Sequence, residues 1–404
     1  MTASVPRSIL PPLTAEEQGH SLRLAARIRA ALASAGGWLS FERFMELALY
    51  APGLGYYSAG SAKLGSGGDF VTAPEVSDLF SRCIARQCAA VLLRTGGEIL
   101  ELGAGTGRMA AALLTELAAQ RVLPERYAIL EVSADLAARQ RERLALLPRA
   151  LGARVVWLDE LPAQPLHGVL LANEVADALP CRRFRYDADG ISELGVVLEA
   201  GSGEASTAAA PIRFRERAVA ADASLVQDLD EILAGLPEAL PPGYTSEVCA
   251  RIGPWINALS DCLARGLLLL CDYGLPRRHY YHPQRVSGTL RCHYRQLAHD
   301  DPYVNLGVQD ITAWVDFTRV ADAALAAGLE VSGFATQAAF LLGLGVEELV
   351  NEAGAGIERT RLAGEARRLI MPEEMGEAFK MIALTRDLDI PLAGFALQDL
   401  GRLL

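Results

Sequence analysis

Three glycines occupy alternate positions in the segment ILELGAGTGRMAAALL, residues 99–114, between an apolar run and a helical pattern. Because glycine has no Cβ and tolerates positive φ, Gly103, Gly105 and Gly107 let the backbone come close to a ligand. A phosphate-binding loop would need a lysine after these glycines, and a dinucleotide fingerprint would need a glycine where Arg108 stands. The spacing therefore argues against both patterns.

Two acidic residues flank this loop: Glu101 lies just before it, and Glu131 ends the next apolar run. A carboxylate at a strand end can accept charge-assisted hydrogen bonds from both hydroxyls of a ribose. The glycine spacing with these acids resembles class I S-adenosyl-L-methionine (SAM) methyltransferases, whose cofactor has no phosphates. A glycine turn followed by a solvated glutamate is the alternative interpretation.

A second group of polar side chains follows the apolar run at 168–172, in the stretch LLANEVADALP. Asn173, Glu174 and Asp177 come where the carboxyl ends of parallel strands line a ligand crevice. Methyl transfer is an in-line displacement that needs alignment of the reacting groups, and a guanidine acceptor would need carboxylates to orient its planar fork. These three residues are the catalytic candidates. The alternative makes Asn173 and Asp177 helix caps.

Candidate substrate-binding residues follow the apolar run at 267–272. Asp272 ends that run, so the same strand-end rule places it at the crevice. Tyr273, Tyr280 and Tyr281 could form an aromatic wall for a guanidinium, with core packing as the alternative.

Four histidines and a cysteine in this part of the chain raise the question of a metal site. Their spacing matches no zinc pattern with paired ligands at both ends, so we expect no metal. The residues are His279, His282, Cys292, His293 and His299.

The elements that must position these residues alternate along the chain. Expected strands are 98–102, 127–132, 154–158, 168–172, 267–272, 329–335 and 377–387. Expected helices are 21–37, 40–50, 77–94, 107–120, 134–147, 254–265 and 317–327. Near-continuous apolar strands interleaved with helices predict an α/β fold with a parallel sheet covered on both faces.

Four blocks follow from this pattern. They are an N-terminal helical region, 1–95, with a glycine-rich lid at 51–77; a first core part, 96–183; a largely antiparallel insertion, 184–250; and a second core part, 251–404, with a substrate-region insertion at 273–316. A long stretch with little regular structure, such as 51–77, is more often functional than idle.

Composition limits the partners. The 404 residues carry a net charge of −11, which argues against a general binder of nucleic-acid backbone. No apolar run approaches the roughly 20 residues of a membrane span, and the N-terminus lacks a signal peptide's apolar core. The seven cysteines form no CxxC pair and indicate reduced thiols. We expect a cytoplasmic location.

Several blocks resemble one known family closely. YAPGLGYYS, GDFVTAPEVS, ELGAGTG, LEVSADLAARQ, LLANEVADALPCRRF, DYGLPRRHYYHPQRVSGTLRCHYRQ, QDITAWVDF and GLEVSGFATQAAFL are similar to the MidA family. This family includes the mitochondrial complex I assembly-factor arginine methyltransferase and bacterial relatives. The resemblance covers roughly residues 40–345 and implies a class I methyltransferase core with a Rossmann-like seven-stranded sheet, an N-terminal helical region and an inserted substrate region.

By position, the resemblance implies roles for the candidate residues. Gly103, Gly105, Gly107 and Glu131 match the SAM site, and Asn173, Glu174 and Asp177 match the active-site element. Asp69, Pro74 and Glu75 match a segment expected to close over the cofactor. Val175 and Ala176 stand where the family usually has aromatic residues.

The resulting expectation is a SAM-dependent methyltransferase that symmetrically dimethylates arginine in a protein partner of the respiratory complex I type. The alternative is an assembly chaperone that binds SAM without transferring a methyl group. The intact glycines and Glu131 favour retained cofactor binding.

Overall fold

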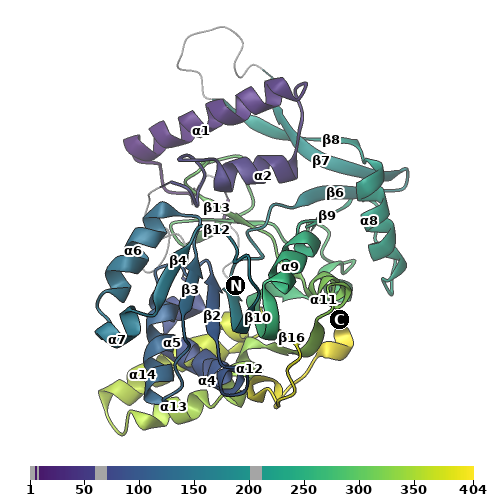
Figure 1. Cartoon of the computed structure of the whole chain (residues 1–404). Helices are drawn as coiled ribbons and strands as arrows, with labels where there is room; N and C mark the ends of the chain where they lie inside the picture. Colours follow the sequence, from purple (N-terminus) through teal and green to yellow (C-terminus); the bar gives the residue numbers. More distant parts are fainter. Residues whose placement is uncertain (1–4, 7–8, 60–70, 201–211) are drawn as a thin grey trace.

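The computed structural model describes residues 5–6, 9–59, 71–200 and 212–404. Within these residues, seven strands form the main path of the central sheet (Figure 1). In spatial order they are β15 (Glu330–Thr336), β16 (Phe379–Arg386), β10 (Leu263–Leu275), β5 (Leu166–Asn173), β2 (Glu98–Leu102), β3 (Tyr127–Leu130) and β4 (Val155–Leu158). β14 (Val315–Asp316) pairs with the end of β10. The five strands from β10 to β4 are parallel, and β16 runs antiparallel to both of its neighbours. This arrangement confirms the α/β fold and the seven expected strands. The sheet is mixed, however, because β16 is antiparallel to its neighbours, whereas a parallel sheet was expected.

Helices cover both faces of this sheet because the side chains of each strand alternate between its faces. Leu267 and Leu269 of β10 pack into one hydrophobic cluster, whereas Leu268 and Leu270 pack into another. The first cluster contains α4 (Asp78–Thr95), α5 (Arg108–Ala119), α12 (Gln337–Gly343), α13 (Val346–Glu352) and α14 (Ile357–Ile370). The second contains α9 (Ile252–Asp261) and α11 (Phe317–Ala326). The remaining core helices are α6 (Ala134–Leu144) and α7 (Arg149–Gly152).

A second, antiparallel sheet forms the other large part of the molecule. It contains β1 (Leu39–Ser40), β7 (Gly190–Leu198), β6 (Arg182–Asp187) and β9 (Tyr244–Val248), with β8 (Phe214–Ala220) paired to β7. The helices α1 (Ala15–Ser34) and α2 (Phe41–Tyr50) pack with Val196 and Phe214 of this sheet. Figure 1 shows these two helices beside β7 and β8, far from them in sequence. The N-terminal region and the insertion thus share one hydrophobic cluster.

A small third sheet connects the two parts. Its order is β12 (Leu297–His299), β11 (Arg291–Tyr294) and β13 (Asp310–Thr312), all antiparallel. Cys292 and Ile311 from this sheet join the cluster of α1 and α2. Along the chain, the short helix α3 (Ala73–Val76) precedes α4, and the short helix α10 (Arg277–Tyr280) follows β10.

Some sequence predictions of elements were incomplete or wrong. The helix expected at 254–265 ends at Asp261, because Leu263 already begins β10. The interval 184–250 holds antiparallel strands as expected, but it also contains the helix α8 (Ala223–Ala234). The helices α12 to α14 were not predicted.

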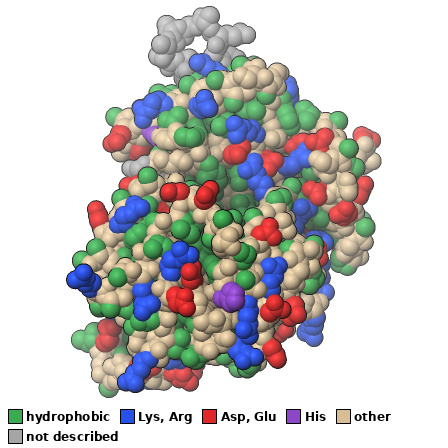
Figure 2. All heavy atoms as spheres, viewed as in Figure 1, with side chains coloured by type: hydrophobic (Ala, Val, Ile, Leu, Met, Phe, Trp, Pro, Cys, Tyr) green, Lys and Arg blue, Asp and Glu red, His purple; other side chains and the backbone are tan. Residues whose placement is uncertain are grey.

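One face of the molecule carries side chains of both charges. On the face shown in Figure 2, acidic and basic side chains are interspersed, and hydrophobic atoms show in the recess between the two large parts. Among the described residues, no helix combines the length and apolar character that a membrane crossing requires.

Candidate active site

The glycine loop between β2 and α5 adopts the backbone conformation that its composition predicts. Gly103 has φ 62° and Gly105 φ 54°, in the left-handed region that side chains rarely adopt. Both residues line a cavity, which we call the glycine-loop cavity. Gly107 has φ 77° and packs against α6: a Cβ added to it would lie 3.3 Å from the Cα of Gln140. Gly103 and Gly105 therefore open the backbone to a ligand, and Gly107 permits close helix packing.

The two acidic residues of the loop occupy different environments. Glu101 is buried and accepts a 2.6 Å hydrogen bond from the Tyr127 hydroxyl. Burial raises the pKa of Glu101 to about 7, against the effect of that bond. Glu131 accepts hydrogen bonds from the Ser133 amide at 2.8 Å and from Gln140 Nε2 at 2.9 Å. Gln140 Nε2 also donates to the Gly105 carbonyl at 3.0 Å, so one side chain fixes both the loop and Glu131.

The glycine-loop cavity extends from Glu131 and Val132 past the glycines to Asn173 and Glu174. Val132 is 74% exposed, so this end of the cavity reaches the surface. The cavity therefore joins the acid expected to hold a ribose to the residues expected to perform the chemistry.

The segment α3 closes one side of this cavity. Pro74 and Glu75 line it, and the Glu75 carboxylate accepts a hydrogen bond from the Thr106 hydroxyl in the glycine loop. Arg108 Nη1 donates to the Glu75 carbonyl at 2.6 Å, and Arg108 Nε pairs with Asp78 at 2.8 Å. Asp69 and the glycines at 65, 67 and 68 lie outside the described residues.

The loop after β5 brings Asn173 and Glu174 to the cavity. Glu174 has φ 54°, which is uncommon for a residue with a side chain, and its amide donates to the Cys271 carbonyl at 2.9 Å. Asn173 Nδ2 donates to Glu174 Oε1 at 3.2 Å, whereas Asn173 Oδ1 is buried without a hydrogen-bond partner among the described residues. Burial, reinforced by the charge of Asp177, raises the pKa of Glu174 to about 8. Residues 174–180 form turns and no helix, so the interpretation of Asn173 and Asp177 as helix caps is wrong.

Asp177 lines a second cavity, which we call the Asp177 cleft. Tyr273, Trp314 and Phe379 contribute aromatic side chains to its lining, and Glu373 and Glu374 contribute acidic ones. The two linings share no residue. Burial raises the pKa of Asp177, as do the neighbouring charges of Asp272 and Asp310. The 173–177 loop therefore contributes one carboxylate to the lining of each cavity.

Asp272 does not line either cavity, contrary to its prediction as a substrate contact. Its side chain is buried and turns toward the backbone of the 173–177 loop, where it accepts hydrogen bonds from the amides of Ala176 and Asp177. Burial and the charge of Glu174 raise the pKa of Asp272, while these hydrogen bonds oppose the rise.

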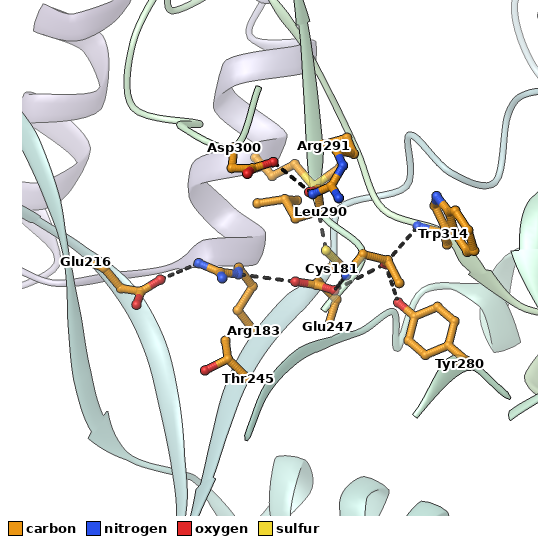
Figure 3. Close-up of polar contacts among 12 residues, drawn as sticks. Cys181, Arg183, Glu216, Thr245, Glu247, Tyr280, Leu290, Arg291, Asp300 and Trp314 are labelled. Carbon is orange, nitrogen blue, oxygen red and sulfur yellow. Dashed lines mark hydrogen bonds and ion pairs between the residues drawn. The ribbon is translucent and has the colours of Figure 1, made fainter. Parts of the chain in front are cut away.

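Tyr280 and Tyr281 also lie apart from both cavities, so the structure does not bring them together with Tyr273. They are buried in a cluster with Phe184 and α8. The Tyr280 hydroxyl shares a 3.1 Å hydrogen bond with Thr289, close to the buried Glu247 (Figure 3). The chain turns into α10 after β10, which carries both rings into the core of the insertion. Tyr280 and Tyr281 therefore pack in a hydrophobic core, which was the alternative to an aromatic wall for a guanidinium.

Two tyrosines that the sequence analysis did not single out complete the glycine-loop cavity. Tyr50 and Tyr57 line it beside Asn173 and Glu174, with their rings stacked at 5.6 Å. The Tyr50 hydroxyl donates to the Ala178 carbonyl at 3.0 Å, and the Tyr57 hydroxyl donates to Asp310 Oδ1 at 3.0 Å. Both tyrosines belong to the segment YAPGLGYYS, which contributed to the family resemblance, but the sequence did not indicate which residues they contact.

Val175 and Ala176 take different positions. Val175 lines the glycine-loop cavity, where its Cγ2 would lie 3.4 Å from a Cβ on Gly103, and Ala176 is buried against the central sheet. Among the described residues, no group of three or more His, Cys, Asp or Glu side chains is arranged to hold a metal ion.

Comparison with known proteins decides the family. Residues 83–335 match a family model described as an S-adenosyl-L-methionine-dependent methyltransferase. The chain belongs to this methyltransferase family. It is 41% identical to a protein from Burkholderia thailandensis whose crystal structure holds S-adenosyl-homocysteine, with a TM-score of 0.89 over 98% of this chain and 100% of that one.

Curated relatives of this methyltransferase include two mitochondrial proteins named protein arginine methyltransferase NDUFAF7 or its homolog. The zebrafish (Danio rerio) protein is 28% identical over 87% of this chain and 84% of its own length. The Drosophila melanogaster protein is 27% identical over 94% of this chain and 90% of its own length.

The cofactor of this methyltransferase is S-adenosyl-L-methionine. The glycine-loop cavity fits such a group, because its backbone is bare at Gly103 and Gly105 and because the Glu131 carboxylate lines it. Glu131, Gly103, Gly105 and Glu101 line this cavity and would hold the cofactor there.

Proposed function

We propose that this methyltransferase is a protein arginine N-methyltransferase that forms symmetric dimethylarginine. The observation that carries the proposal is the 173–177 loop, which holds Asn173 and Glu174 in the cofactor cavity and Asp177 in a separate cleft. A loop that supplies one carboxylate to each of two cavities suits a planar cation that more than one acid must orient. The names of the curated relatives support the same acceptor.

The carboxylates supply both orientation and a proton acceptor. A bound SAM supplies a methyl group on a sulfonium in the glycine-loop cavity. Glu174 and Asp177 attract the positively charged guanidinium, and its arrival lowers their pKa values and restores their charge. Asn173 Oδ1 can accept a hydrogen bond from the acceptor nitrogen. As the nitrogen–carbon bond forms and the sulfur–carbon bond breaks, the nitrogen releases its proton to one of these carboxylates.

In this proposal the acceptor chain lies in the Asp177 cleft, and its guanidinium extends past Asp177 to Glu174 and the methyl group. Tyr273, Trp314 and Phe379 give it aromatic walls, over which a guanidinium is attracted. The resemblance to the MidA family points to a protein substrate of the respiratory complex I type, and we propose that class of partner in the cytoplasm.

The test separates cofactor binding from transfer. We expect Glu174→Ala and Asp177→Ala to bind SAM within about threefold of the parent protein and to transfer methyl groups at least about a hundredfold more slowly. Glu193→Ala, which removes a buried acid paired with Arg182 in the second sheet, is the control.

The assay uses tritiated SAM and a lysate from a strain that lacks the enzyme, followed by amino-acid analysis of the labelled protein. Label on arginine supports the proposal. Label on lysine, glutamine or a small molecule would overturn the arginine acceptor. Bound SAM without transfer to any acceptor would favour the assembly chaperone.

A further inference from the structure

Asp272 is a buried acid that lines neither the cofactor cavity nor the Asp177 cleft, so it faces no ligand in either of them. Its side chain is 2% exposed, and all three of its described hydrogen bonds come from backbone amides. Oδ2 accepts from Ala176 at 2.9 Å and from Asp177 at 3.2 Å, and Oδ1 accepts from Tyr273 at 2.8 Å. Burying a carboxylate is costly unless hydrogen bonds compensate it, so these amides are the reason that it can remain there.

The loop that Asp272 contacts needs such support. Glu174 has φ 54°, and residues held in sparsely populated backbone regions persist only where the surrounding structure over-determines them. The amide of Glu174 is held by the Cys271 carbonyl, the residue before Asp272 in β10. Adjacent positions of one strand therefore fix the start and the middle of the loop.

We propose that Asp272 is a positioning residue for methyl transfer, holding Glu174 toward the cofactor and Asp177 toward the acceptor. Its two bonds to the loop lie between these residues, at Ala176 and Asp177. A shift of this segment would move both carboxylates together, and misplacement of reacting groups by about 1 Å can cost about a hundredfold in rate. The proposal rests on methyl transfer at this loop and does not depend on which acceptor is used.

The variant Asp272→Asn keeps the shape and removes the charge. The two loop amides share Oδ2 and the Tyr273 amide takes Oδ1, so an asparagine can turn either its amide nitrogen or its neutral oxygen toward the loop. The nitrogen cannot accept a hydrogen bond and the neutral oxygen accepts more weakly than a carboxylate, so the contact with the loop weakens in either orientation. We expect kcat to fall about a hundredfold while KM for SAM changes less than about threefold. Asp272→Ser, which keeps one acceptor oxygen, is a second variant with the same expected direction.

Asp316→Asn is the matched control. Asp316 is also buried and accepts two backbone amides, those of Thr318 and Arg319, but at the start of α11. It reproduces the loss of a buried backbone-bonded acid, and we expect it to leave kcat within about threefold.

A double-mutant cycle distinguishes positioning from general destabilisation. If Asp272 acts through Glu174, Asp272→Asn should slow a Glu174→Gln enzyme by less than about threefold, because residues that act as a unit are not additive. Additive losses, or an Asp272→Asn enzyme with parental kcat, would overturn the proposal.

Hydrogen exchange tests the geometry without any acceptor. The amide hydrogens of Ala176 and Asp177 should exchange faster in Asp272→Asn than in the parent protein. In Asp316→Asn their exchange rates should equal those of the parent protein. Unchanged exchange at these two amides would refute the positioning contact. A parent enzyme that labels an acceptor other than arginine would refute the proposed function alone, because the kcat ratio can be measured on that acceptor.

Discussion

The ionisation of Glu174, a proposed catalytic residue, also affects the stability of the folded protein. Its pKa in the folded protein is raised from 4.5 to about 8, so between these values the folded state holds a proton that the unfolded chain releases. Stability therefore falls as pH rises through this window. We expect Glu174→Gln to be more stable than the parent protein by an amount that grows from pH 5.5 to pH 8. Denaturant unfolding of the cofactor-free proteins measures it, with the exposed Glu125→Gln as control. A pH-independent difference would contradict the assignment.

A substitution of Gly105 tests whether the glycine loop binds the cofactor. At φ 54° a β-branched residue is strained, and its side chain would stand where the backbone faces the cavity. We expect Gly105→Val to fold and to lose at least about a hundredfold in SAM affinity by calorimetry. Gly36→Val places the same strain at φ 72°, in open space after α1, and should keep its affinity. Equal SAM binding by both variants would refute the role of the loop.

Single residues were predictable from sequence where their type and local spacing carry the information. Glycine spacing identified the loop, and the strand-end rule placed Asn173, Glu174 and Asp272 at one edge of the sheet. The rule does not say which way a side chain turns, so Asp272 was expected to face the substrate. The Tyr57–Asp310 contact joins positions far apart in the chain and leaves no local signal.

Among the elements, α3 depends on one arginine. Arg108 in the first turn of α5 bonds to the Glu75 carbonyl and pairs with Asp78. We expect Arg108→Ala to speed amide exchange at Glu75 and Val76 and to weaken SAM binding about fivefold, as the loss of roughly 1 kcal/mol implies. Arg126→Ala, which removes the ion pair with Glu98, is the control. Unchanged exchange at α3 would show that Thr106 and the surrounding packing suffice to hold it.

The central strands were predictable because parallel strands buried on both faces form continuous apolar runs. The helices α12 and α13 have seven residues each, too few for a helical period to stand out. The helix α14 is mostly exposed, with Ala366 and Leu369 as its buried residues, so it shows only a weak apolar stripe. Each of these helices is stabilised by tertiary packing, which the local pattern of apolar residues does not reveal.

At the scale of the whole molecule, the N-terminal region is part of the active site. Tyr50 at the end of α2 donates to the Ala178 carbonyl, just beyond the catalytic loop. We expect Tyr50→Phe to slow methyl transfer about tenfold, equivalent to about 1.4 kcal/mol, with SAM affinity nearly unchanged. Tyr186→Phe in β6 is the control. Parental transfer by Tyr50→Phe would limit the N-terminal helices to a packing function.

The different linings of the two cavities have a kinetic consequence for the dimethylation that we propose. No residue lines both cavities, and the cofactor cavity reaches the surface at Val132, so in the proposed arrangement the cofactor can exchange while the acceptor stays bound. Spent S-adenosyl-homocysteine can depart and fresh SAM can enter while the monomethylated acceptor stays in the Asp177 cleft. Two methyl groups would then be added in one encounter, and a pulse of tritiated SAM chased with excess unlabelled acceptor should give dimethylarginine without free monomethylated intermediate.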